Sequence, residues 1–224
     1  MKKAISMFLA IVVLVCMAIP CLAKDEFENL EDARIGDYVL FGSYVQEDDE
    51  EAEPIIWEVI SKKGDCLLLL SRDCLDSLPY QEEYGKTSWK DSYLREWLNE
   101  DFYDEAFTED EQDLIMYKTV QNKKNPEYGN TNLKDTRDRV FILSISEALE
   151  YFEKKKERLS EPSEYALEEA VSYDADDRGY WLRTAGMDAR FAAVVNPDGG
   201  INYGGYYASE YAYVRPAVWV EVED

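Results

Sequence analysis

The chain has 224 residues, a formal net charge of −24 and no histidine. Such an acidic chain repels the phosphates of nucleic acids and the headgroups of anionic membranes, so we expect neither as a partner. The missing imidazole excludes serine–histidine and cysteine–histidine nucleophile pairs, as well as the usual zinc and iron sites. We therefore expect no cofactor and no metal site, and no catalytic residue stands out.

The first residues have the pattern of a secretory signal peptide. Lys2 and Lys3 precede an apolar run from Ala4 to about Ile19, and Cys21 and Ala23 are small residues placed as at a cleavage site. The run is about 16 residues long, which is shorter than the ~20 of a membrane-spanning helix. We expect residues 1–23 to be cleaved off after Ala23 and the protein to be secreted or exposed at the cell surface.

A lipoprotein anchor is the alternative fate of this leader. Cys16 or Cys21 would then carry the lipid. Val15 and Pro20 are poor residues directly before a modified cysteine, which disfavours this alternative.

Residues 24–34 form an acidic lead, and residues 35–224 are expected to form one domain, since about 200 residues are ample for one core and few for two.

Aromatic and β-branched residues predict three early strands, at Tyr38–Val45, Pro54–Ser61 and Cys66–Ser71. The letters "KKGD" predict a tight turn between the second and the third. The run "EDDEEAE" lacks the ligand spacing of a calcium loop and is read as a solvated loop.

Helical patterns fill the middle of the chain. Residues 89–107 predict an amphipathic helix with Asn99 near its end. A capping box at Thr108 opens a second helix through Ile115, and a polar connector rich in asparagine and lysine follows over residues 121–135. After a strand in "DRVFILS", a capping box at Ser144 opens a helix over residues 145–159, and "PS" introduces a short helix over residues 163–170.

The last 45 or so residues are rich in glycine and read as short strands. These are "GYWLRT", "FAAVVN", "GGINYGGYY" and "YVRPAVWVEV", separated by the turn sequences "NPDGG" and "NYGG". Strands, a helical middle and a β ending together predict an α+β fold.

Two arginines in this ending are expected to be buried. Alternation along a strand places Arg183 on the same face as Trp181, and Arg215 on the same face as Tyr213 and Trp219. A buried guanidinium keeps its charge and needs a carboxylate or several carbonyls. We expect structural ion pairs to carboxylates of earlier elements. An anionic ligand clamped by these arginines remains the alternative.

Candidate partners for the arginines are Glu58, Asp138 and Glu96. Glu58 shares its strand face with Ile56 and Ile60, which is an unusual place for an unpaired acid.

Only two cysteines, Cys66 and Cys74, follow the leader. They either close a small disulfide loop or remain as buried thiols, and the sequence leaves both readings open.

Six blocks follow one another in the sequence: "IGDYVLFGSYVQ", "EPIIWEVI", "WKDSYLREWLNEDFYDEAF", "DRVFILSISEALEYF", "YWLRTAG" and "YVRPAVWV". In this order they resemble a bacterial family catalogued as a domain of unknown function, number 6273 in that series, which occurs mostly in secreted or surface proteins of Gram-positive bacteria. The blocks span Ile35 to Val222. The family's ending is similar to the C-type-lectin-like fold of formylglycine-generating enzymes, so the resemblance implies a single C-type-lectin-like domain.

The chain departs from these relatives in two ways. Thr184, Ala185 and Gly186 stand where the family usually shows Ser-Pro-Gly. No cysteine follows Cys74, and the generating enzymes act through a late cysteine pair. The resemblance therefore implies a fold and no catalytic mechanism.

The stretch from Met187 to Tyr213 has the composition of an adaptable binding surface, because tyrosine offers large amphipathic contacts and asparagine offers hydrogen bonds. We expect a non-catalytic module that binds a glycan or a protein on a cell surface. The candidate ligand residues are Tyr203, Tyr206, Tyr207, Tyr211, Asn202 and Asn196. The alternatives are a structural domain of the cell envelope without a discrete ligand, and a hydrolase with a carboxylate pair.

Overall fold

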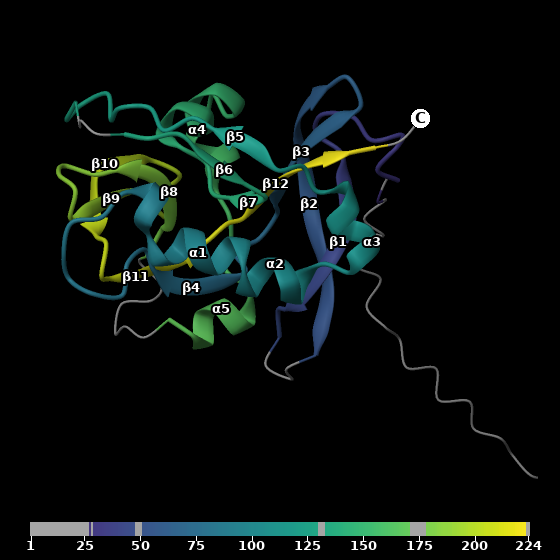
Figure 1. Cartoon of the computed structure of the whole chain (residues 1–224), viewed down its shortest axis with the longest axis horizontal. Helices are drawn as coiled ribbons and strands as arrows, with labels where there is room; N and C mark the ends of the chain where they lie inside the picture. The colour runs from purple at the N-terminus through teal and green to yellow at the C-terminus, as the bar shows by residue number, and fades with distance from the viewer. Residues whose placement is uncertain (1–26, 28, 48–50, 130–132, 171–177, 223–224) are drawn as a thin grey trace, which may run out of the picture.

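The structure is a computed structural model that describes residues 27, 29–47, 51–129, 133–170 and 178–222 (Figure 1). The expected signal peptide, residues 1–23, lies outside these residues. The described part has a mixed α+β fold with more strand than helix, as the sequence predicts.

One five-stranded sheet brings early strands of the chain together with its last strand. Its order is β1-β2-β3-β12-β7, and all neighbours are antiparallel. The strands are β1 (Tyr38–Val45), β2 (Ala52–Lys63), β3 (Cys66–Ser71), β7 (Val140–Phe141) and β12 (Ala217–Glu221). The β2–β3 turn contains Gly64 at a φ of 60°, so the predicted tight turn is confirmed.

A second five-stranded sheet is built mainly from the glycine-rich ending. Its order is β10-β9-β8-β11-β4, and the β11–β8 pair is parallel. The strands are β4 (Asp76–Pro79), β8 (Tyr180–Ala185), β9 (Phe191–Val195), β10 (Ile201–Tyr207) and β11 (Tyr211–Val214). A small separate sheet pairs β5 (Lys118–Val120) with β6 (Thr136–Asp138).

Two predicted strands are each divided between sheets. The expected last strand "YVRPAVWVEV" is β11 in the second sheet followed by β12 in the first, and Arg215 and Pro216 connect them (Figure 1). Pro216 has no N–H to donate, so a continuous ladder cannot pass through it. The expected strand "DRVFILS" is likewise split into the end of β6 and β7.

The helices are short. They are η1 (Trp89–Asp91), α1 (Tyr93–Asn99), α2 (Asp101–Ala106), α3 (Glu109–Leu114), α4 (Ile145–Tyr151), η2 (Lys155–Arg158) and α5 (Glu164–Glu168). Both predicted capping boxes, at Thr108 and Ser144, are confirmed.

Two predicted helices are shorter than their patterns suggest. The expected helix over residues 89–107 is interrupted because Ser92 caps α1 by accepting a hydrogen bond from the N–H of Arg95 (3.3 Å). The helix after Ser144 ends at Tyr151, because Phe152 turns into an extended conformation that buries its ring to 5 % exposure.

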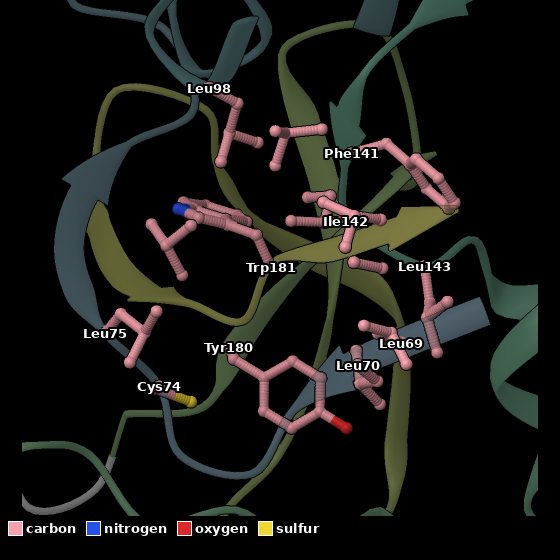
Figure 2. Close-up of a cluster of buried hydrophobic side chains, with 14 of the residues drawn as sticks. Leu69, Leu70, Cys74, Leu75, Leu98, Phe141, Ile142, Leu143, Tyr180 and Trp181 are labelled. Atoms are coloured by element: carbon pink, nitrogen blue, oxygen red, sulfur yellow. The ribbon is translucent and has the colours of Figure 1, made fainter. Parts of the chain in front are cut away.

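A single hydrophobic core joins the two large sheets. Trp57 of the first sheet and Trp181 of the second are both fully buried within it. Figure 2 shows part of this core, where Leu98 from α1 and Ile142 lie near Trp181. The core fixes the two sheets relative to each other and holds the loops at their ends in place.

Candidate functional site

Arg183 is buried in β8 and neutralised inside the protein. Its side chain is 1 % exposed and forms a salt bridge with Glu147, a residue of α4. The guanidinium also donates to the carbonyls of Ile142 (2.8 Å) and Gln121 (3.0 Å). The partner is thus a carboxylate from an earlier element, although neither Glu58 nor Asp138 supplies it. These contacts give Arg183 a structural role, because they join β8 to α4 and to two other segments of the chain.

Glu147 has two roles at the start of α4. Its carboxylate accepts a hydrogen bond from the backbone N–H of Ser144 (2.8 Å) in the capping box and also forms the salt bridge with Arg183. Burial raises the pKa of Glu147, but the charge and hydrogen bonds of Arg183, helped by Ser144, outweigh this and leave the pKa below its usual value of 4.5. Glu147 therefore stays ionised at neutral pH.

Arg215 lies in the connector between β11 and β12 and is 3 % exposed. Its Nε donates to the carbonyl of Ser71 (2.8 Å), and its Nη1 donates to the hydroxyl of Tyr180 (3.4 Å). No carboxylate among the described residues forms a salt bridge with it, so the expected ion pair is wrong for Arg215. The carbonyl of Ser71 and the hydroxyl of Tyr180 are its partners in this connector.

Asp138 is fully buried at the end of β6 and is paired with a different cation. It accepts hydrogen bonds from Nε of Arg95 (2.6 Å), from the indole of Trp89 (2.8 Å) and from the hydroxyl of Thr136 (2.7 Å). Asp138 is thus a structural ion-pair residue that ties α1 to β6, and it does not reach Arg183 or Arg215. Glu96, the third candidate, is exposed on α1.

The predicted ligand tyrosines of β10 face different surroundings. Tyr207 is 38 % exposed, and its ring lies 4.2 Å from that of Phe191. The ring of Tyr206 packs edge-on against buried Trp181 at 6.1 Å. Tyr203 lines a separate cavity of about 320 Å³ next to Lys155.

The other predicted ligand residues also lie apart from one another. Asn196 lines the same small cavity as Tyr203. Asn202 accepts a hydrogen bond from the N–H of Gly205 (3.0 Å) within β10, and the carbonyl of Tyr211 accepts one from Arg178 (2.6 Å). The six residues therefore do not form one platform, and Tyr207 is the member most open to a partner.

A cleft of about 440 Å³ opens at the end of β8. This cationic cleft is lined by four exposed lysines and by the buried Arg183 just described. The lysines are Lys86, Lys90, Lys123 and Lys134. Asp188 is the only carboxylate among the described residues that line it, and Arg190 neutralises that carboxylate at 2.6 Å. Its volume lies within the range of ligand sites, roughly 300–1,000 Å³.

Backbone and amide hydrogen bonds fix the walls of the cationic cleft. The N–H of Thr87 donates to the carbonyl of Ala189 (2.8 Å), which joins the two loops that carry Lys86 and Asp188. Asn125 is 1 % exposed, and its amide donates to the carbonyls of Ala185 (2.9 Å) and Tyr203 (2.8 Å). The lysine-bearing connector is thereby held against β8 and β10.

Three rings form an aromatic ridge on the chain segments that carry the cleft residues Lys86 and Ala189: exposed Tyr84 and Tyr207, and half-buried Phe191. The rings of Tyr84 and Tyr207 are 5.6 Å apart, and Tyr84 is 64 % exposed. Arg190 donates to the hydroxyl of Tyr84 (3.3 Å). The ridge and the cleft share two chain segments, because Lys86 lies two residues after Tyr84 and Ala189 lies two residues before Phe191. Cleft and ridge together form our candidate site.

Sequence reasoning did not find the cationic cleft. Its lysines come from segments that lie far apart in the chain, and their convergence depends on the two hydrogen-bonded walls. The available signal was the asparagine- and lysine-rich connector at residues 121–135, which stands out in a chain with 48 acidic and 24 basic residues.

The described residues offer little other reactive chemistry. Cys66 and Cys74 are both free, so the disulfide alternative does not form. Burial, opposed by a hydrogen bond with Ser160, raises the pKa of the Cys74 thiol to about 11. No group of three or more histidine, cysteine or acidic side chains in the described ranges is placed to hold a metal ion.

No helix within the described part of the chain is both long and apolar enough to cross a bilayer.

The fold and the cleft define a mixed α+β domain with a ligand-sized cationic cleft. Residues 64–222 match the model of the family described as Domain of unknown function (DUF6273), and the chain belongs to this family. The match begins at Gly64, so the blocks of β1 and β2, which were expected to take part, lie outside it. No curated protein and no solved structure matches the chain.

Proposed function

We propose that the protein is a non-catalytic binding module for an acidic glycan. The cationic cleft would hold the anionic substituents, and the aromatic ridge would stack on a neighbouring sugar ring. The observation that carries this proposal is the convergence of four lysines around one cleft in a chain whose net charge is −24. The cleft and the ridge thus each account for one part of such a ligand, the charged groups and the sugar ring.

The cleft is suited to carboxylate, sulfate or phosphate groups. Ammonium groups form charge-assisted hydrogen bonds with such oxygens, which are roughly twice as strong as neutral ones. Arg183 is paired with Glu147 and forms part of the inner wall, where its hydrogen bonds to Gln121 and Ile142 keep it in place, so the positive potential comes from the four lysines. The lysines are exposed and flexible, so they can adapt to substituents at different positions on a sugar.

The ridge is suited to the apolar face of a sugar ring. Tyr84 and Tyr207 present large amphipathic rings at low entropic cost. Because ridge and cleft share two chain segments, a ligand of two or more sugar units can contact both. A free inorganic anion uses only the cleft and is expected to bind more weakly.

Salt limits the distance over which the charges of the chain act on a ligand. At physiological salt, charges more than ~8 Å away are largely screened, so the lysines dominate inside the cleft. A long polyanion would also lie over the acidic remainder of the surface and be repelled. The proposal is therefore a short acidic glycan on a cell surface, with nucleic acids and anionic membranes as non-partners.

Charge reversal in the cleft tests the proposal. In Lys123→Glu/Lys134→Glu, we expect the affinity for acidic glycans on an array to fall about 100-fold, at about tenfold for each lost lysine contact. The matched control is Lys124→Glu/Lys154→Glu, which changes the net charge equally at exposed lysines outside the cleft lining. Its affinity should stay within about threefold of the parent.

A ridge variant completes this test. Tyr84→Ala should weaken binding of a disaccharide ligand about tenfold and leave inorganic sulfate unaffected. Equal binding of acidic glycans to the parent and to the Lys123/Lys134 variant would contradict the proposal. Binding of neutral glycans alone would contradict it as well.

We also propose that the domain has the C-type-lectin-like fold and that the protein comes from the surface of a Gram-positive bacterium. The order of the six sequence blocks supports both points. An experimental structure superposed on C-type-lectin-like domains tests the first point, and a different order of strands in the superposed sheets would contradict it.

We further propose export with cleavage after Ala23. The basic start, the short apolar run and the small residues at positions 21 and 23 support this. Mass spectrometry of the secreted protein should find Lys24 as the first residue. Recovery of the protein in the membrane fraction with a lipid on Cys16 or Cys21 would contradict cleavage after Ala23.

A further inference from the structure

Another cavity lies on the first sheet and shares no lining residue with the cationic cleft. It has a volume of about 400 Å³ and lies among β1, β2, the Arg215 connector and the segment that follows α4. We call it the Arg215 cavity. Its apolar lining includes Ile60 and Phe152, which are 7 % and 5 % exposed. It is large enough for a small metabolite.

Two opposite charges line this cavity without pairing. The Arg215 guanidinium is buried, and its bonds to Ser71 and Tyr180 use Nε and Nη1, so Nη2 has no hydrogen-bond partner among the described residues. The backbone of Glu58 pairs within the sheet, whereas its side chain forms no hydrogen bond or salt bridge with a described residue. Burial raises the pKa of Glu58, while the charge of Arg215 lowers it in part. The two groups are therefore close enough to interact electrostatically and too far apart to form a salt bridge.

Backbone pairing places both charged residues beside the same part of β3. Glu58 of β2 stands opposite Leu70 of β3, and Arg215 is held by the carbonyl of Ser71, the next residue of β3. Both charges thus sit at the same end of β3, each on a fixed backbone. The other charges in the lining have their own contacts or are exposed: Glu157 accepts from the N–H of Lys154 (3.0 Å), and Arg72 pairs with Asp73 (2.8 Å).

We propose that the Arg215 cavity binds an apolar α-amino acid, with its carboxylate on Arg215 and its ammonium on Glu58. A purely anionic ligand would meet the Glu58 carboxylate, and a purely cationic ligand would meet the Arg215 guanidinium. An α-amino acid carries both charges on one carbon, so it fits between a cation and an anion that do not reach each other. The rings of Tyr38 and Tyr151 and the apolar lining leave room for an apolar side chain.

Ligand analogues test the proposal without altering the protein. L-leucine should bind by isothermal titration calorimetry. Leucinamide, which lacks the carboxylate, and 4-methylpentanoate, which lacks the ammonium, should each bind at least about tenfold more weakly. Absence of leucine binding, or leucinamide binding as tightly as leucine, would overturn the proposal.

Variants then assign the two ends of the ligand. Glu58→Gln should weaken leucine about tenfold and leave 4-methylpentanoate no weaker than in the parent. Glu109→Gln removes an exposed carboxylate of α3 outside the cavity lining and serves as the control, with unchanged leucine affinity. Arg215→Lys keeps a cation but loses the planar fork, and should weaken leucine while sparing leucinamide. If Glu58→Gln weakens leucine and 4-methylpentanoate equally, the assignment of the ammonium to Glu58 is wrong.

Discussion

Arg183→Met is expected to lower the free energy of unfolding by about 3 kcal/mol, because it removes one partner of a buried ion pair. The substitution leaves the Glu147 carboxylate without its cation and the carbonyls of Ile142 and Gln121 without their donors. Glu147 remains 24 % exposed, so water offsets part of the loss and places the effect at the lower end of the usual range. Urea denaturation followed by fluorescence measures it.

Two comparisons make this result specific. Arg34 is exposed, and Arg34→Met should change stability by no more than about 0.5 kcal/mol. Arg183→Met/Glu147→Gln should be more stable than Arg183→Met alone, because the buried carboxylate charge is gone. Similar stability losses for Arg34→Met and Arg183→Met would show that Arg183 is not a structural cation.

The same pair gives the protein a pH dependence with a defined sign. The folded pKa of Glu147 lies below its usual value of 4.5, so on acidification the unfolded chain binds this proton first. The contribution of the pair is therefore complete above about pH 4.5 and is lost as the pH falls through the folded pKa. Arg183→Met should lack this part of the acid-induced loss of stability.

Gly205→Ala is expected to destabilise the protein by about 3 kcal/mol or more. Gly205 has a φ of 75°, and a Cβ at this position would lie 1.9 Å from the carbonyl oxygen of Ala192 on the neighbouring strand β9. A left-handed conformation costs an alanine about 1–2 kcal/mol, and forcing backbone apart in a packed sheet adds about 1–3 kcal/mol. Thermal and urea unfolding of the two proteins measure the difference.

Gly64→Ala is the matched control for the Gly205 prediction. Gly64 has a φ of 60°, and nothing lies within 4 Å of the position a Cβ would occupy. It should therefore show the conformational cost alone, about 1–2 kcal/mol. If the two alanine variants unfold at the same urea concentration, the close approach of β10 to β9 is wrong.

Local patterns in the sequence predict much of the secondary structure. β1 and β3 have the predicted bounds, and the capping boxes at Thr108 and Ser144 open helices where expected. These features depend on residues only a few positions apart. Ser92 and Pro216 also carry local signals, for a helix cap and for a break in a ladder, but the stronger apolar periodicity around them conceals both.

The candidate site was less predictable because it depends on distant contacts. Burial of Arg183 could be expected from its apolar neighbours, yet its partner Glu147 looked fully explained by the capping box. The tyrosines of β10 were recognised by composition, whereas the bulge that includes Gly205 decides which of them point outward. The convergence of Lys86 with Lys123 requires the folded loops. No short window of sequence contains that information.

The connector at Arg215 and Pro216 has a consequence for the order of folding. β11 lies between β8 and β4, and β12 lies between β3 and β7, so the last strands of the chain are interior strands of both large sheets. A nascent chain emerging N-terminus first holds two sheets with a missing middle strand until residues 211–221 arrive. Cooperative closure of both sheets therefore cannot occur before residues 211–221 have been made.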